Sequence, residues 1–334
     1  MPGNMPDETP GEIIDPKLFV EGVLAGKRRS IAKAITLVES SLPEHRRLAA
    51  KVMEGLLPHT GKSVRLGITG VPGVGKSTFV ENLGLLLVNR GLKVAVLAVD
   101  PSSSRSGGSI LGDKTRMEKL ASHPSTFIRP SPSGTTLGGV AAKTRETLLV
   151  CEAAGFDVVL VETVGVGQSE TSVATMVDFF LALMITGAGD ELQGIKKGVL
   201  EVADAIAINK CDGDNMERAE RARLEFEIAM HIVTPESSSW RPPVLTCSSI
   251  VENGTLKVWE TVLKHKKIMT RTGEFDLRRR GQALAWMWTL VDEGLKIRFR
   301  QNNNISKRIP EISRKVEHDF MSPSAAAEDL LSYL

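Results

Sequence analysis

A glycine-rich stretch that ends in a lysine and a hydroxyl residue is the part of this chain best suited to chemistry. Residues 70–77 read GVPGVGKS. In this Walker A pattern the glycines let successive backbone N–H groups turn inward around phosphate oxygens, the lysine reaches the β- and γ-phosphates, and the hydroxyl binds Mg²⁺. The pattern therefore predicts a nucleoside triphosphate with Mg²⁺. The residues expected to hold them are Gly73, Val74, Gly75, Lys76, Ser77 and Thr78.

The neighbouring segments are those that such a loop requires. The apolar run at 64–69 predicts a buried strand before it, and residues 78–87 predict a helix after it. The N-terminus of that helix adds a partial positive charge beside the phosphates.

A second motif, Asn209-Lys210-Cys211-Asp212, follows an apolar run at 205–208 and indicates which base is bound. The Asp212 carboxylate can accept hydrogen bonds from N1–H and the 2-amino group of guanine, whereas adenine offers no donor at either position. We expect Asn209 at the base edge and Lys210 along the base face. The stretch 246–249 reads TCSS, in which Ser248 could offer its backbone N–H to guanine O6 or simply cap a helix.

Several acidic residues could serve the metal and the γ-phosphate. Glu162 ends an apolar run, as in a Walker B strand, and is a candidate for Mg²⁺ and for catalysis. Gly165 follows where Ras-like GTPases have a glycine that donates to the γ-phosphate, whereas Gln168 comes two positions later than their water-positioning glutamine. Asp100 is a second metal candidate and Asp113 a catalytic candidate. Each of these two acids could instead cap a helix or turn.

The composition excludes several classes of protein. The chain has 334 residues, 42% hydrophobic and 25% charged, with a net charge of +2, which gives no strong case for a nucleic acid or membrane partner. No apolar run reaches the ~20 residues of a membrane span. The three cysteines lack metal-ligand spacing. Residues 1–12 resemble neither a signal nor a transit peptide, so we expect a cytoplasmic location.

Apolar runs alternate with helical patterns from residue 64 onward. The runs lie at 64–69, 93–99, 126–129, 157–162, 179–186, 203–209 and 243–247, and the helical patterns at 76–90, 114–122, 138–154, 169–177, 195–202, 215–232 and 255–268. Near-continuous apolar strands are typical of a parallel sheet covered on both faces. We therefore predict a doubly wound, mainly parallel α/β domain with ligands at the carboxyl ends of its strands.

The chain is expected to divide into four parts. These are a disordered tail at 1–15, N-terminal helices at 16–62, the nucleotide domain at 63–270 and a helical arm at 271–334. In the arm, a long helical pattern at 277–300 ends at the asparagines 302–304, and two short helices are expected to begin near Pro310 and Pro323. The arm has too little sheet to form its own core, so it must pack on the main domain or on another chain.

Several long motifs resemble one family, the methylmalonyl-CoA mutase-associated GTPases, which include the bacterial MeaB and ArgK proteins and mitochondrial MMAA. The motifs lie at 100–103, 107–117, 129–132, 162–170 and 189–196. The resemblance implies a homodimeric P-loop GTPase chaperone, with the arm as the dimer contact, that gates adenosylcobalamin delivery to methylmalonyl-CoA mutase and protects or reactivates that enzyme. It also supports Lys76 and Ser77 at phosphate and Mg²⁺, Asp100 and Glu162 around Mg²⁺, and Asn209 and Asp212 at guanine.

Two other functions compete with this one. An ATP-dependent kinase of a transport protein, as the ArgK label suggests, would share the phosphate loop but would have no use for Asp212. A nickel-insertion GTPase would need a relay of Cys and His that the spacing does not offer. Isobutyryl-CoA mutase is an alternative partner, and a direct contact with cobalamin is left open.

Overall fold

The computed structural model describes most of the chain, in two compact units. Described are residues 15–40, 42–99, 117–131, 137–163, 169–186, 197–235, 238–250 and 252–333. The first unit comprises residues 1–279 and the second residues 280–334.

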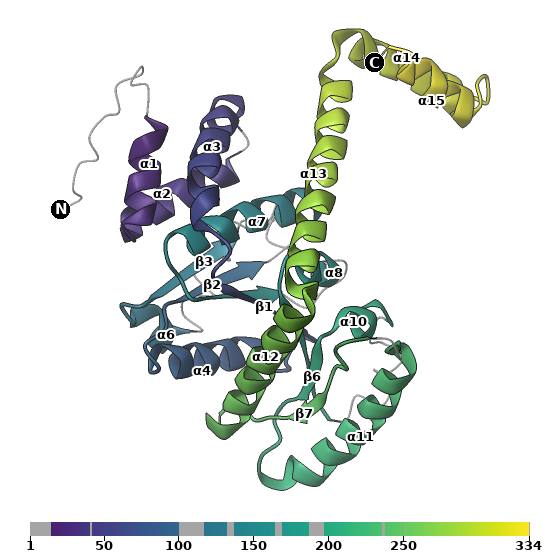
Figure 1. The fold of residues 1–334 in the computed structure, drawn as a ribbon. Helices are drawn as coiled ribbons and strands as arrows, with labels where there is room; N and C mark the ends of the chain where they lie inside the picture. The colour runs from purple at the N-terminus through teal and green to yellow at the C-terminus, as the bar shows by residue number, and fades with distance from the viewer. Residues whose placement is uncertain are drawn as a thin grey trace, which may run out of the picture. The chain divides into compact units, whose positions relative to one another are not determined.

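A seven-stranded parallel sheet forms the centre of the first unit (Figure 1). Its strands are β1 (Val64–Gly70), β2 (Val94–Val99), β3 (Thr126–Ser131), β4 (Val158–Thr163), β5 (Phe179–Met184), β6 (Ala205–Ile208) and β7 (Val244–Thr246), in the order β3-β2-β4-β1-β5-β6-β7. Every neighbouring pair is parallel. The predicted fold class and all the predicted strands are confirmed, although β5 ends before the expected residue 186.

Helices cover both faces of this sheet. They are α4 (Lys76–Val88), α6 (Glu118–Ser122), α7 (Leu137–Ala153), α8 (Ser169–Ala174), α10 (Lys197–Val202), α11 (Met216–Val233) and α12 (Glu252–Thr272). On one face, Phe79 and Leu83 of α4 and Trp259 of α12 pack in one buried cluster with alternate strand residues. The other strand residues pack in a second cluster with α7, α8, α10 and α11. The sheet is therefore buried on both sides, which accounts for the apolar strands.

Three helices precede the sheet: α1 (Pro16–Leu24), α2 (Arg28–Glu39) and α3 (Pro43–Leu56), followed by a short 3₁₀ turn at Leu57–His59. The apolar side chains Ile31, Ile35 and Val38 of α2 are buried in the same cluster as α7. The apolar side chains of α1 are only partly buried, because Val23 is inaccessible whereas Leu18 is 67% exposed.

The second unit holds most of α13 (Glu274–Gln301), then α14 (Asn303–Glu317) and α15 (Pro323–Leu331). The prediction that a helix begins near Pro310 is wrong, because Pro310 lies inside α14. The helix begins earlier because Asn302 caps it, accepting from Asn304 N at 2.9 Å. Asn302 also donates to Tyr333 O at 3.0 Å, which joins the start of α14 to the residues after α15.

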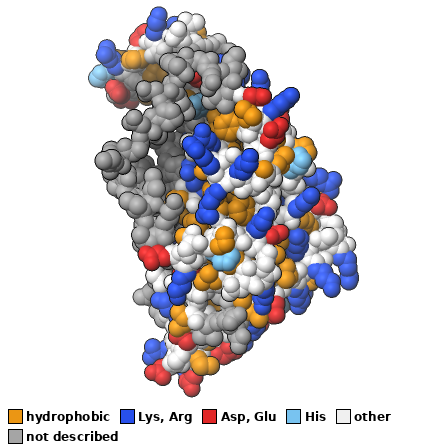
Figure 2. All heavy atoms as spheres, turned by 90° about the vertical axis from the view of Figure 1, so that its left-hand side faces the viewer, with side chains coloured by type: hydrophobic (Ala, Val, Ile, Leu, Met, Phe, Trp, Pro, Cys, Tyr) orange, Lys and Arg blue, Asp and Glu red, His pale blue; other side chains and the backbone are white. Residues whose placement is uncertain are grey.

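Side chains of every class lie on the surface. Figure 2 shows one face, on which Lys and Arg side chains are spread among acidic and apolar ones. Among the described helices, none combines the length and the apolarity needed to cross a bilayer.

Candidate nucleotide site

The phosphate loop connects β1 to α4 at the carboxyl edge of the sheet. Gly70, Gly73 and Gly75 have φ values of 151°, 80° and 95°, a region that favours glycine. A Cβ on Gly70 would lie 2.4 Å from Leu183 O of the adjacent strand β5, so no larger residue fits there. The backbone thus takes the turn that the Walker A pattern predicts.

The N-terminus of α4 opens directly onto this loop. Gly75 is its N-cap, and no side chain in the described part of the chain caps its first turn. The helix has 13 residues, so its partial positive charge and its first N–H groups form a ready site for an anion. Phosphate is the anion that the Walker A pattern predicts at this position.

Two polar side chains of α4 face the same region. Lys76 is buried and its Nζ donates to the carbonyl oxygens of Gly70 at 2.6 Å and Val71 at 3.2 Å. Ser77 donates from Oγ to Oε1 of Glu162 at 3.0 Å. The predicted phosphate and metal residues Ser77 and Glu162, 85 positions apart in the chain, therefore lie together.

The ends of β1 and β4 are also joined beside this pair. Thr163 donates to Thr69 through their hydroxyl groups at 2.9 Å, and both side chains are fully buried. The bond joins the ends of two strands that the parallel ladder already holds in register, with Ile68 opposite Glu162.

The base motif follows β6, and its first residue is fully buried. Asn209 donates from Nδ2 to Val74 O of the phosphate loop at 2.7 Å. Its Oδ1 accepts from the backbone N–H of Ser249 at 3.0 Å and from the Ser249 hydroxyl at 2.8 Å. Asn209 therefore joins three loops, whereas its predicted contact with the base edge stays a prediction.

Ser248 holds the carboxylate of Asp212, the group predicted to recognise guanine. Ser248 donates from Oγ to Oδ2 of Asp212 at 2.5 Å. A Cβ on Gly254, in the first turn of α12, would lie 2.6 Å from Ser248 N, so α12 packs closely on this loop. The predicted backbone contact of Ser248 with guanine O6 stays a prediction.

Other predicted site residues lie outside the described residues: Asp100, Asp113, Gly165 and Gln168. Among the residues that the structure does describe, no three His, Cys, Asp or Glu side chains are grouped as a metal site.

Sequence reasoning missed the role of Ser249. The motif placed Ser248 and Ser249 side by side in a serine pair, and no local signal distinguishes them. In the structure Ser249 forms a hydrogen bond with Asn209, and Ser248 forms one with Asp212. Which serine meets which partner depends on the pairing of β6 with β7.

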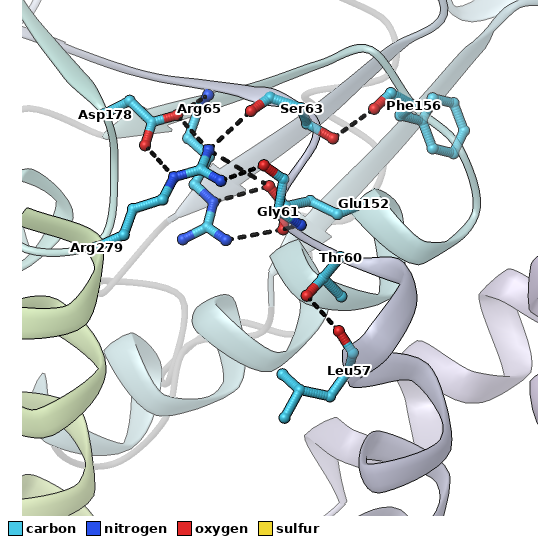
Figure 3. Close-up of polar contacts among 9 residues, drawn as sticks. All are labelled: Leu57, Thr60, Gly61, Ser63, Arg65, Glu152, Phe156, Asp178 and Arg279. Carbon is cyan, nitrogen blue, oxygen red and sulfur yellow. Dashed lines mark hydrogen bonds and ion pairs between the residues drawn. The ribbon is translucent and has the colours of Figure 1, made fainter. Parts of the chain in front are cut away.

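A polar cluster lies at the opposite, amino edge of the sheet (Figure 3). Arg279, near the start of α13, makes two hydrogen bonds of 2.7 Å to the Asp178 carboxylate just before β5. It also donates to the backbone oxygens of Gly61 at 2.5 Å and Ser63 at 2.8 Å. Burial by itself would lower the pKa of Arg279, but the hydrogen bonds and charge of Asp178 outweigh it, so the pKa is raised and the side chain stays charged.

Comparisons with known proteins agree with this site. A family model described as methylmalonyl Co-A mutase-associated GTPase MeaB matches residues 31–304. A probable GTPase of Mycobacterium tuberculosis is 52% identical over 309 residues, covering 92% of each chain. GTPase ArgK of Escherichia coli is 46% identical over 92% of this chain and 93% of its own. A mitochondrial methylmalonic aciduria type A homolog of Mus musculus is 42% identical over 97% of this chain and 82% of its own.

One solved structure covers nearly the whole fold. The crystal structure of a LAO/AO transport system kinase matches 98% of this chain and 99% of its own, with a TM-score of 0.76 and 39% identity. The phosphate loop, the base motif and the family match point to the same activity, hydrolysis of GTP. The chain belongs to the methylmalonyl-CoA mutase-associated GTPase (MeaB) family and is a P-loop GTP hydrolase.

Proposed function

We propose that this GTPase is a chaperone of methylmalonyl-CoA mutase. GTP binding and hydrolysis would gate the loading of adenosylcobalamin into the mutase and protect or reactivate it. The observation that carries the proposal is the match of residues 31–304 to a family described by its association with this mutase. The mouse relative, whose name refers to methylmalonic aciduria, supports the same partner.

The site residues suit phosphoryl transfer to water. The first turn of α4 and the Lys76 ammonium would bind the phosphates, and both place positive charge where negative charge develops. In this chemistry catalysis comes from positioning and charge neutralisation, with no covalent intermediate on the protein. Asp212 would select guanine through two hydrogen bonds to the base.

The structure brings together two side chains whose oxygen atoms are suitable ligands for Mg²⁺. The Ser77 hydroxyl and the Glu162 carboxylate lie 3.0 Å apart, and oxygen ligands of this kind are those that Mg²⁺ prefers. We propose that these two residues hold the ion, directly or through water, with Asp100 as a further candidate. When bound, the ion would neutralise charge on the β- and γ-phosphates.

We also propose a homodimer that forms through the second unit. The part of α13 in this unit has no buried residue, and its apolar side chains recur at helical spacing. Those exposed include Leu284, Trp288, Val291 and Leu295, at 60%, 61%, 40% and 49%. An apolar stripe of this length on one helix is typical of a protein–protein contact.

The test uses purified methylmalonyl-CoA mutase and the full chain. We expect the GTP-loaded protein to co-elute with the mutase in size-exclusion chromatography and the mutase to change the rate of GTP hydrolysis. Lys76→Ala, which should not bind nucleotide tightly, is the matched control. A parallel run with isobutyryl-CoA mutase separates the two candidate partners. The absence of both co-elution and a rate change with either mutase would overturn the proposal.

A further inference from the structure

Asn215 links the guanine motif to a neighbouring strand through both ends of its side-chain amide. It is the last residue of a short 3₁₀ turn, Gly213–Asn215, that follows Asp212. Its Nδ2 donates to Lys210 O at 2.8 Å, and its Oδ1 accepts from the Thr186 hydroxyl at 2.7 Å. Its backbone N–H donates to Asp212 O at 3.1 Å. A single residue thus contacts the backbone on both sides of Cys211.

The backbone that Asn215 holds is unfavourable by itself. Lys210 has a φ of 60°, and among the described residues only Asp319 is another non-glycine residue with positive φ. Gly213 follows with a φ of 53°. A left-handed residue with a side chain costs free energy and persists only where its surroundings enforce it. The amide of Asn215, which donates to the carbonyl oxygen of Lys210 itself, is in position to do so.

Thr186 supplies the fixed end of this link. It lies two residues beyond β5, which pairs with β6, the strand that leads into the guanine motif. The Thr186–Asn215 bond therefore joins the turn after Asp212 to the edge of the sheet. On its other side Asp212 is held by the Ser248 hydroxyl. The position of Asp212 therefore depends on two contacts: the Ser248 hydroxyl on its carboxylate, and the turn that Asn215 ties to Thr186.

We propose that Asn215 is a positioning residue for guanine discrimination, acting through Lys210 and Asp212 and anchored by Thr186. Its role is to keep the Asp212 carboxylate where both oxygens can accept from the base. The inference rests on guanine-nucleotide binding by this chain and is independent of the mutase proposal, since its test uses no partner protein.

The test compares GDP with IDP, because inosine lacks only the 2-amino group that Asp212 would read. A lost hydrogen bond to a charged group changes affinity by roughly 10- to 150-fold, so we expect the wild-type chain to prefer GDP by a factor in this range. Asn215→Ala should reduce this preference by about fivefold or more, by weakening GDP far more than IDP. Isothermal titration calorimetry of both nucleotides gives the ratio.

Three further variants keep the test independent of folding. Thr186→Val has nearly the same shape without the donor and should shift the ratio in the same direction, whereas Thr186→Ser should restore it. Asp214→Asn lies in the same turn, and its side chain makes no hydrogen bond among the described residues, so it should leave the ratio unchanged.

The outcomes decide the proposal. If Asn215→Ala and Thr186→Val weaken GDP and IDP by equal factors, the residues have only a structural role and the proposal is overturned. Unchanged affinities overturn it as well. A wild-type chain without a GDP preference would show that Asp212 does not read the base, which also removes the role assigned to Asn215.

Discussion

Asn209 donates a hydrogen bond of 2.7 Å to the backbone oxygen of Val74, so the base motif and the phosphate loop form one connected unit. The two residues are 135 positions apart, and both are fully buried. Any ligand that occupies both loops therefore meets a site whose two halves are already fixed relative to each other.

Asn209→Ala tests this connection. It removes the donor to Val74 and the acceptor of Ser249, leaving buried polar groups without partners, which costs about 1–3 kcal/mol per group. We expect GDP affinity to fall at least about tenfold and unfolding stability to fall by a similar free energy. Calorimetry and urea unfolding measure the two. Asn82→Ala is the control, because Asn82 is only half-buried and its amide makes a solvent-exposed hydrogen bond to Thr78 O on its own helix. Equal effects from both variants would contradict the connection.

Gly75→Ala tests the close approach of the same two loops. Gly75 has a φ of 95°, and a Cβ there would lie 2.9 Å from Asn209 Nδ2. We expect loss of both stability and nucleotide affinity. Gly91→Ala separates the causes, since Gly91 has a φ of 82° but a Cβ on it would meet nothing within 4 Å. It should cost about 1 kcal/mol of stability and leave GDP affinity unchanged. Weaker GDP binding by Gly91→Ala would contradict this reading.

Arg279→Leu tests the polar cluster at the amino edge of the sheet. The Arg279 and Asp178 side chains are 14% and 4% exposed, so removing the arginine leaves a buried carboxylate without its charged partner. The expected loss of unfolding free energy is about 3–5 kcal/mol. Arg223→Ala breaks exposed ion pairs with Glu220 and Glu227 and should cost only about 0–1 kcal/mol. Urea unfolding of the two variants checks the contrast, and similar losses would refute it.

Because Glu146 is partly buried, its ionisation should make the stability of the fold depend on pH. Burial raises the pKa of Glu146 from its ordinary 4.5 to about 7, and the charge of Lys143 offsets this only in part. The folded chain then holds more protons than the unfolded chain between these two values, so Glu146 lowers stability as pH rises through that window.

Glu146→Gln should remove this contribution. We expect it to raise the free energy of unfolding more at pH 8 than at pH 5, measured by urea unfolding at each pH. The exposed Glu225→Gln variant should show no such difference. A gain that does not depend on pH would show that ionisation of Glu146 is not the cause.

Local patterns predicted the sheet and the phosphate loop because both depend on neighbouring residues. A buried parallel strand must be apolar along its length, and the Walker A glycines, Lys76 and Ser77 act within a few positions of one another. The predicted helix start near Pro310 shows where a local interpretation failed. The asparagine run does end α13 at Gln301, as predicted, but Asn302 is also a good N-cap, so α14 starts ahead of Pro310.

The supports of the site could not be predicted in the same way. The bonds from Asn209 to Val74 and from Thr186 to Asn215 depend on which strands are neighbours and on their register. A sequence gives the polar residues but not the strand order β1-β5-β6 that brings them together. The same holds for Arg279 and Asp178, which lie 101 positions apart.

The most direct test of the account is a change of base specificity at Asp212. Xanthine offers an acceptor where guanine has its 2-amino donor, so the amide of Asp212→Asn matches xanthine as the carboxylate matches guanine. The measurement is kcat/KM for GTP, XTP and ATP with the wild-type chain and with this variant. The account predicts that the wild type prefers GTP over both others and that the variant prefers XTP. A wild-type preference for ATP, or a variant that still prefers GTP, would contradict it.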